Sequence, residues 1–210
     1  MAALEVVTDD RMRADWRTGL PVLSGQLVTL RELQRGDAPT LYAALCRPEV
    51  ARSTWPLPES VDAFERFIEW AWAERATGKY ICYGIVPRGR EQVVGLFEFR
   101  QLQPGFFRGE LGFVMDPDKW GTGLFSEGAA LLLEFAFQVI GVHRIEARAA
   151  VDNARGNAAL RKIGARHEGI LRAAFVYEGQ YIDQNLWAIL SDRAFAQATH
   201  TRGATAHAHI

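Results

Sequence analysis

The sequence predicts an α/β (α+β) fold, in which helices cover both faces of a mixed, mostly antiparallel and twisted sheet of about seven strands. Two observations predict it. Short apolar segments bounded by Gly, Pro and Asp alternate along the chain with longer segments that repeat apolar residues at helical spacing. Their order is β-α-α-β-β-β-α-β-α-β-β. Consecutive strands followed by strand–helix units favour a mixed sheet with helices on both sides.

The predicted strands are apolar segments of up to about a dozen residues that end at turn-forming residues. Asp116-Pro117 ends the fourth strand, because proline cannot donate to a strand ladder. Glu178-Gly179 is expected to join the last two strands in a hairpin. The strands are expected at Gln26–Leu33, Tyr80–Val86, Val93–Leu102, Glu110–Met115, His143–Val151, Ala165–Val176 and Tyr181–Leu190.

Capping residues and glycines set the ends of the predicted helices. An acidic or hydroxyl side chain before a helix can accept a hydrogen bond from its first turn, and a glycine after the helix permits its left-handed stop. Pro39 fits the first turn of the first helix. The helices are expected from Asp37 through Cys46, from Ser60 to about Thr77 before Gly78, over Leu124–Ile140 before Gly141, and over Asn157–Ile163 before Gly164.

The 210 residues suit one domain, expected at 25–192. An N-terminal arm, 1–24, is expected to precede it, with a short helix around Asp10–Trp16. A flexible tail rich in Ala, Thr and His, 193–210, is expected to follow. His207 and His209 in this tail have no carboxylate or thiol beside them, so they are expected to be solvated and not to bind a metal.

Composition excludes several classes of function. A formal net charge of −1 provides no global positive field for nucleic acid or an anionic membrane. The N-terminus lacks the apolar core of a signal peptide, and no apolar run approaches a membrane span, so a cytoplasmic protein is expected. Cys46 and Cys82 lack metal-ligand spacing and are expected to be reduced, largely buried thiols.

The segment Trp120-Gly121-Thr122-Gly123 stands between a strand and a long helix. Such a junction presents several unpaired N–H groups together with the positive end of the helix dipole, and this combination binds phosphate. The two glycines permit positive φ and let backbone amides approach an oxygen closely. No Gly-Lys-Ser/Thr follows, so the segment is not a P-loop. A Gly-x-Gly pair alone equally fits a simple turn.

The neighbouring residues extend the pattern. The segment Met115–Ala129 resembles the pyrophosphate loop of the GNAT N-acetyltransferase superfamily, and most closely its RimJ/RimL-like branch. The resemblance covers roughly Gln26 to Leu190. Further segments that resemble this branch are Gly141–Glu146, Asp152–Asn157, Leu160–Ala165 and Glu168–Arg172.

The resemblance implies a GNAT fold, with strands four and five splayed apart around the pantetheine arm of acetyl-CoA. Backbone groups of Phe113, Val114 and Met115 would pair with that arm, and one N–H would polarise the thioester carbonyl. The loop would cradle the pyrophosphate, and Asn153 would hydrogen-bond the arm or brace the splayed backbone. The implied coenzyme-binding residues are Phe113, Val114, Met115, Lys119, Trp120, Gly121, Thr122, Gly123, Leu124, Phe125, Ser126, Asn153 and Asn157.

Three positions depart from the superfamily pattern. Asp118 stands where Gln or Arg is frequent, so either Lys119 compensates its charge or Asp118 points away. Gly156 replaces a serine. Leu160 occupies the place of a tyrosine that protonates the leaving thiolate in many members. A thiol pKa of about 8.5 makes thiolate a tolerable leaving group without that acid.

The amine acceptor must lose a proton before it attacks the thioester. Glu110, at the start of strand four, and Glu98, in the middle of strand three, are the candidate bases. Each could instead be a solvated or salt-bridged sheet residue, paired with Arg100 or Arg108. The resemblance places Trp55, in a proline-rich loop, and Tyr177, in the last hairpin, at the border of the acceptor site.

These observations together predict an acyl-CoA-dependent N-acyltransferase that moves an acetyl group from acetyl-CoA to a primary amine by direct attack. The acceptor is either a protein N-terminus or a small molecule. Two alternatives stay open, a non-catalytic acyl-CoA-binding sensor or scaffold and a transferase that uses another donor such as succinyl-CoA. No metal is expected. A homodimer through the final hairpin is a further expectation.

Overall fold

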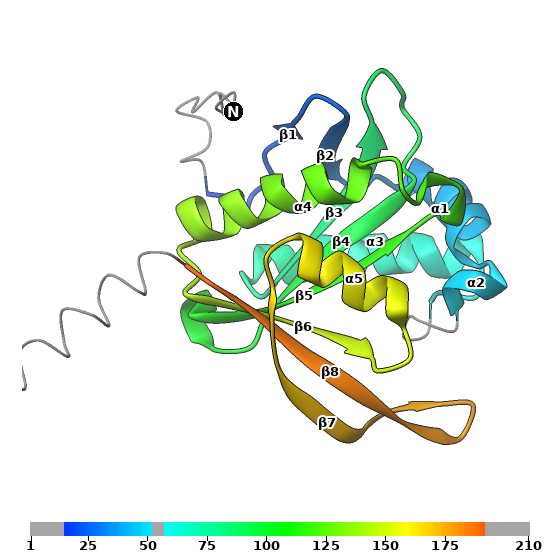
Figure 1. Cartoon of the computed structure of the whole chain (residues 1–210). Coiled ribbons are helices and arrows are strands. Elements are labelled where there is room, and N and C mark those ends of the chain that lie inside the picture. The colour runs from blue at the N-terminus through cyan, green and yellow to red at the C-terminus, as the bar shows by residue number, and fades with distance from the viewer. Residues whose placement is uncertain (1–14, 52–56, 192–210) are drawn as a thin grey trace, which may run out of the picture.

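The structure is a computed structural model of the chain, and it describes residues 15–51 and 57–191. One eight-stranded sheet runs through these residues in the order β1-β2-β3-β4-β5-β6-β8-β7 (Figure 1). Neighbouring strands are antiparallel except β5 and β6, which are parallel. The strands are β1 (Leu23–Ser24), β2 (Val28–Glu32), β3 (Tyr80–Pro87), β4 (Gly95–Gln101), β5 (Arg108–Met115), β6 (Arg144–Ala150), β7 (Arg166–Tyr177) and β8 (Gln180–Leu190).

Helices cover both faces of the sheet, as predicted. On one face lie α1 (Ala38–Leu45), α2 (Pro48–Ala51) and α3 (Val61–Ala76), whose buried residues form one core cluster. On the other lie α4 (Leu124–Phe135) and α5 (Ala154–Lys162), whose buried residues belong to a second cluster (Figure 1). The mixed α/β architecture expected from the order of elements is therefore confirmed.

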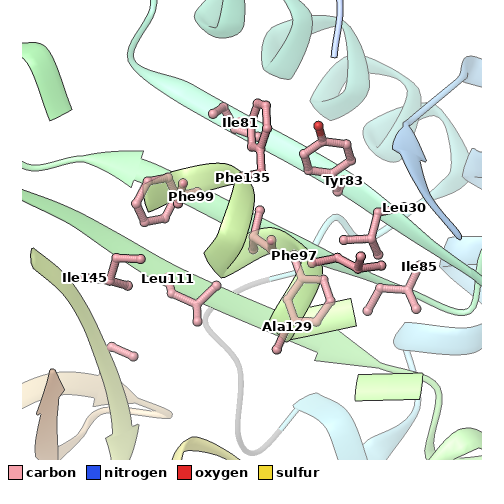
Figure 2. Close-up of a cluster of buried hydrophobic side chains, with 14 of the residues drawn as sticks. Leu30, Ile81, Tyr83, Ile85, Phe97, Phe99, Leu111, Ala129, Phe135 and Ile145 are labelled. Carbon is pink, nitrogen blue, oxygen red and sulfur yellow. The ribbon is translucent and has the colours of Figure 1, made fainter. Parts of the chain in front are cut away.

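Strand alternation separates the two clusters. Along β3, Ile81, Tyr83 and Ile85 point toward α4 (Figure 2), whereas Tyr80 and Cys82 belong to the cluster under α3. Because both faces of β3 are buried, it appears in the sequence as an almost continuous apolar run.

Strands β5 and β6 separate soon after they meet. Their parallel pairing covers only Arg108–Arg144, Gly109–Ile145 and Glu110–Glu146, although β5 continues to Met115 and β6 to Ala150. These two strands are the fourth and fifth that the sequence predicts, so their expected splay is confirmed. The gap between β5 and β6 opens toward the first turn of α4.

The sheet has one strand more than the roughly seven expected, since the expected first strand is β2 and Leu23–Ser24 adds β1 to its edge. The residues just before this strand also reach the core. Trp16 is 6% exposed and makes an edge contact with Phe106 at 5.8 Å between ring centroids. The described part of the expected peripheral arm therefore contributes to the fold.

Several helix boundaries differ from the predictions. The Ser60 side chain caps α3 as expected, accepting from the Ala63 N–H at 3.1 Å. The expected cap by Asp37 is wrong, because its carboxylate pairs with Arg31 and accepts from the Gln34 N–H. The structure differs from the predictions at three other helices. An additional helix, α2, forms inside an expected loop, and α4 continues as a π-helical turn over Ala136–Ile140. Helix α5 begins three residues earlier than expected.

The final hairpin has the expected turn. Glu178 and Gly179 both have positive φ, of 48° and 76°, which matches the right-handed twist of the two strands. Tyr177 pairs with Gln180 across it. The hairpin extends from the body of the sheet, and β7 is an edge strand (Figure 1).

Both cysteines are free, but only Cys82 is buried; the expectation of a buried Cys46 is wrong, because its position at the end of α1 is exposed. In the described ranges no helix is both long and apolar enough to cross a membrane. Trp55, His207, His209 and most of the short helix expected around Asp10–Trp16 lie outside the described residues.

Glu127 ties the first turn of α4 to the start of the sheet. Its carboxylate accepts hydrogen bonds from the backbone N–H groups of Gln26, Leu27 and Val28, at 2.9, 2.7 and 2.9 Å. We expect Glu127→Ala to lower the free energy of unfolding by about 2–4 kcal/mol, because three donors lose a charged acceptor. Urea denaturation measures the loss. Glu134→Ala, at an exposed position of the same helix, is the control, and equal losses in the two variants would contradict this role.

Candidate active site

A cavity of about 570 Å³ lies where β5, the first turn of α4 and α5 meet, at the open end of the gap between β5 and β6. Its size is that of a small-molecule site. Phe113 lines it from the face of the sheet under α4, and Val114 from the opposite face. The other lining residues are Glu49, Val50, Met115, Lys119, Trp120, Gly121, Gly123, Phe125, Ser126, Asn153, Arg155, Gly156, Ala158, Ala159 and Lys162.

The glycine loop and the first turn of α4 border this cavity and carry a run of backbone N–H groups without a protein acceptor among the described residues. Gly121 and Gly123 have φ of 77° and 91°, a conformation that other residues adopt only with strain. The first hydrogen bond of α4 runs from the Glu127 N–H to the Gly123 carbonyl. Among the described residues, none of the six backbone N–H groups over 121–126 has a protein acceptor. Free amides at the positive end of a helix dipole are an arrangement that can bind an anion.

Trp120 fixes the loop against the end of β5. Its indole N–H donates to the Met115 carbonyl at 3.1 Å. The Arg155 guanidinium lies over the indole ring, 3.9 Å from its centroid. This cation–π contact holds Arg155 at the cavity wall, and its N–H groups have no acceptor among the residues that the structure describes.

Three cationic side chains line the cavity, Lys119, Arg155 and Lys162, against one carboxylate, Glu49. A local excess of positive charge therefore surrounds the amide row, although the whole chain is almost neutral. Arg155 and Lys162 were not among the predicted site residues. Their seven-residue spacing, about two helical turns, places both on one face of α5 and could have indicated them.

Along β5, every second residue directs its backbone N–H and C=O groups toward the gap and not toward β4. The Asp116 N–H donates to the Val94 carbonyl, beyond the end of β4. Strand alternation then directs the backbone groups of Val114 toward β4, and those of Phe113 and Met115 toward the gap. Phe113 and Met115 therefore offer main-chain donors there, whereas Val114 contributes its side chain.

The two predicted asparagines have different surroundings. Asn153 lines the cavity and caps α5, its Oδ1 accepting from the Gly156 N–H at 2.8 Å, and its Nδ2 has no acceptor in the described structure. Asn157 is 7% exposed and does not line the cavity. Its Nδ2 donates to backbone carbonyls, including that of Ala150, while its Oδ1 accepts from Asn185 and Trp187.

Asp118 points away from the phosphate loop. Its carboxylate lies 3.0 Å from the Arg47 guanidinium, which also contacts Asp116 at 3.3 Å, and Asp118 does not line the cavity. The departure from the superfamily pattern therefore places no uncompensated negative charge beside the amide row.

Glu98 lies on the sheet face under α3, outside the cavity but near its wall. Its side chain occupies the space over Gly112, where a Cβ on that glycine would lie 3.5 Å from the Glu98 Oε2. Burial raises the Glu98 pKa to about 7, although neighbouring Tyr80 and Arg100 act to lower it. The Tyr80 hydroxyl is buried and makes no hydrogen bond of ordinary geometry. A carboxyl group that titrates near neutrality suits proton transfer.

Glu110 is an ion-paired residue. One of its oxygens is paired with Arg100, and the other lies 3.6 Å from the Arg148 Nε. The structure thus shows the salt bridge to Arg100 that the sequence left open. A guanidinium group thus lies beside each of the two Glu110 carboxylate oxygens.

The remaining predicted residues lie around this centre. Thr122 and Leu124 do not line the cavity; the Thr122 hydroxyl donates to the Lys119 carbonyl, and Leu124 is buried in the core. Tyr177 lies at the tip of the hairpin, away from the cavity. Leu160, at the position where the resemblance implies a tyrosine, is completely buried in the core.

Comparisons with known proteins agree with this geometry. A family model described as an Acetyltransferase (GNAT) domain matches residues 28–166. The uncharacterized N-acetyltransferase YoaA of Bacillus subtilis is 29% identical over 175 residues, covering 82% of this chain and 98% of YoaA. The spermidine N(1)-acetyltransferase of Vibrio cholerae is 23% identical over 167 residues, covering 79% and 94%. The RimL ribosomal alpha-N-protein acetyltransferase, solved in complex with coenzyme A, matches with a TM-score of 0.75 at 20% identity, covering 82% and 99%.

Proposed function

The chain belongs to the GNAT acetyltransferase family, and from this premise we propose that it transfers an acetyl group from acetyl-CoA to a primary amine at the gap between β5 and β6. One observation carries the proposal. The six backbone N–H groups over 121–126 have no acceptor among the described residues, and four of these residues, Gly121, Gly123, Phe125 and Ser126, line the cavity at the end of this gap. The cavity therefore combines a phosphate site with a free strand edge, the two features that a coenzyme A thioester requires.

The coenzyme would lie along this line. The loop amides, Arg155 and Lys119 would bind the pyrophosphate, with Lys162 available to a further phosphate group. The pantetheine arm would pair with the backbone of Phe113 and Met115 in the manner of an added strand. The free Asn153 amide would donate to one of its carbonyl oxygens.

The chemistry follows from this placement. The amine nitrogen attacks the thioester carbonyl carbon, the C–N bond forms, and the C–S bond breaks to release thiolate, which takes its proton from solvent. A backbone N–H on the gap side of β5 would stabilise the carbonyl oxygen as it becomes negative. Glu98, directly or through a water molecule, would accept the proton that the ammonium group must lose.

Calorimetry with acetyl-CoA and free coenzyme A, followed by thiol release in the presence of an amine panel, tests the proposal. We expect micromolar binding and acceptor-dependent thiol release. Binding of acetyl-CoA without thiol release in the presence of any amine would indicate a sensor or scaffold instead. Absence of acetyl-CoA binding would contradict the proposal. Succinyl-CoA in the same assay compares the donors.

Arg155→Ala should weaken acetyl-CoA binding about 10- to 100-fold, because the variant loses a charge-assisted contact worth about 1.5–3 kcal/mol. Calorimetry at low and high salt measures it, and the difference from the unmodified protein should shrink as salt rises. Arg172→Ala, at an exposed position on β7, is the control. Equal affinity of Arg155→Ala and Arg172→Ala would contradict the assigned role of Arg155.

We further propose a cytoplasmic location and a homodimer formed through the β7–β8 hairpin. Ile170, Val176 and Tyr181 on this hairpin are 54%, 55% and 75% exposed, an unusual concentration of large apolar groups on one element. Sedimentation equilibrium measures the association. A monomer at all concentrations up to the micromolar range would contradict the dimer.

A further inference from the structure

Beside the gap, on the sheet face that carries Glu98, lies a row of charged side chains from β4 to β6. Arg100, Glu110 and Glu146 occupy directly opposed positions on β4, β5 and β6, so their side chains share one face. Arg108 and Arg148 stand two residues from these carboxylates along β5 and β6 and point to the same side. The row therefore borders the start of the gap, where the two strands diverge.

The carboxylates of this row are deeper than its cations. Glu110 and Glu146 have side-chain exposures of 15% and 8%, whereas Arg100, Arg108 and Arg148 have exposures of 54%, 41% and 37%. Solvent on this side of the sheet therefore meets guanidinium groups that lie over buried negative charge.

Arg108 and Arg148 are incompletely satisfied. Each has a carboxylate at only 3.5 and 3.6 Å respectively, and neither side chain donates a hydrogen bond to another described residue. The Arg108 Nε is buried and has no hydrogen-bond partner in the described part of the chain. Guanidinium groups with unused donors, held by ion pairs at fixed positions, match the geometry of a carboxylate or phosphate ligand.

Two further carboxylates border the row. Glu168 is neutralised by a two-point contact with Arg144, which lowers the Glu168 pKa. Glu98 lies beyond Arg100 on the same strand face and, on our proposal, accepts the proton of the amine itself. A cationic substituent on the acceptor would therefore meet the exposed guanidinium groups and be repelled.

We infer that the acceptor is an amine that also carries an anionic group, a carboxylate or a phosphate, which Arg108 and Arg148 bind beside the gap. This rests on the proposed acetyl transfer and specifies its substrate class. Polycationic amines would be poor acceptors.

Matched amines test the inference. One pair is phenylalanine and phenethylamine, which differ by a carboxylate next to the amine. The other is a set of C-terminally amidated tetrapeptides with Asp, Ala or Lys at the second position, which places the anion on a peptide side chain. We expect the anionic member of at least one set to have a kcat/KM at least about 10-fold above its neutral partner, with spermidine below both.

Substitutions assign the effect to the row. Arg108→Gln and Arg148→Gln should each raise KM for the anionic amine about 10-fold while changing kcat/KM for its neutral partner less than about 2-fold. Arg90→Gln, in the exposed turn at the other end of β3, removes the same charge and should leave both unchanged.

The outcomes separate the two proposals. Loss of acetyl-CoA binding in calorimetry would overturn the proposed function. Thiol release that favours the neutral or cationic amines would overturn only the anionic-acceptor inference. If no amine releases thiol, calorimetric titration of the same amines into the coenzyme-loaded protein decides, and equal affinity of anionic and neutral members overturns the inference.

Discussion

Glu98→Gln is expected to lower kcat about 100- to 1000-fold at pH 7 while leaving the affinity for acetyl-CoA within 2-fold of the unmodified protein. The amide fills the same space over Gly112 but cannot accept a proton. In the unmodified protein, kcat/KM should rise with pH through about 7, the pKa of Glu98, as the carboxyl group loses its proton. The variant should lack this rise. Stopped-flow thiol release from pH 5.5 to 8.5 measures both effects.

The same variant has an opposite effect on stability. The folded-state pKa of Glu98, about 7, lies above the ordinary 4.5, so its favourable contribution is complete below pH 4.5 and is lost as pH rises through 7. Glutamine does not titrate. We therefore expect Glu98→Gln to gain stability relative to the unmodified protein between pH 5 and 8, by on the order of 2–3 kcal/mol.

Glu110→Gln is the matched control for the base. It lies one strand away, but it is already paired with Arg100 and Arg148. The rise of kcat/KM near pH 7 should persist in this variant, even if acceptor affinity changes. Loss of the rise in Glu110→Gln, and its survival in Glu98→Gln, would exchange the roles of the two residues.

Asn157→Leu should lower the free energy of unfolding by about 3–5 kcal/mol, the largest stability loss that we expect. Asn157 joins the carbonyl of Ala150, at the end of β6, to the side chains of Asn185 and Trp187 on β8. Leucine leaves the buried Trp187 N–H and the Asn185 amide without their acceptor. Chemical denaturation measures the loss, and the indole fluorescence of the native state should also change.

Asn153→Ala distinguishes the proposed coenzyme-binding role of Asn153 from the structural role of Asn157. It removes the cap of α5, which costs about 1 kcal/mol, together with the free amide that we assign to the coenzyme. In Asn153→Ala we expect a small loss of stability and clearly weaker acetyl-CoA binding. In Asn157→Leu we expect a large loss of stability and a smaller effect on acetyl-CoA binding. Similar stability losses in both variants would contradict the central structural role of Asn157.

Local rules explain what could be predicted from the sequence. Positive φ at Gly121 and Gly123, the free amides of a helix start and the two-residue turn at Glu178-Gly179 all depend on residues adjacent in the chain. The mixed sheet with two helical layers follows from periodicity and element order. The misplaced Asp37 cap shows the limit of such rules, since a neighbouring guanidinium, Arg31, competes for the carboxylate.

The loop Trp120–Gly123, which we propose as the coenzyme site, depends on local backbone geometry, so the sequence by itself determined its conformation and also indicated the family. The proposed base and the proposed acceptor surface depend on distances across the sheet. Glu98 and Glu110 both lie within predicted strands, but only the tertiary structure decides that one lies over a glycine of the next strand and the other between two arginines. Burial and charge pairing arise between strands, and they set both the pKa of a carboxyl group and the chemistry it can perform.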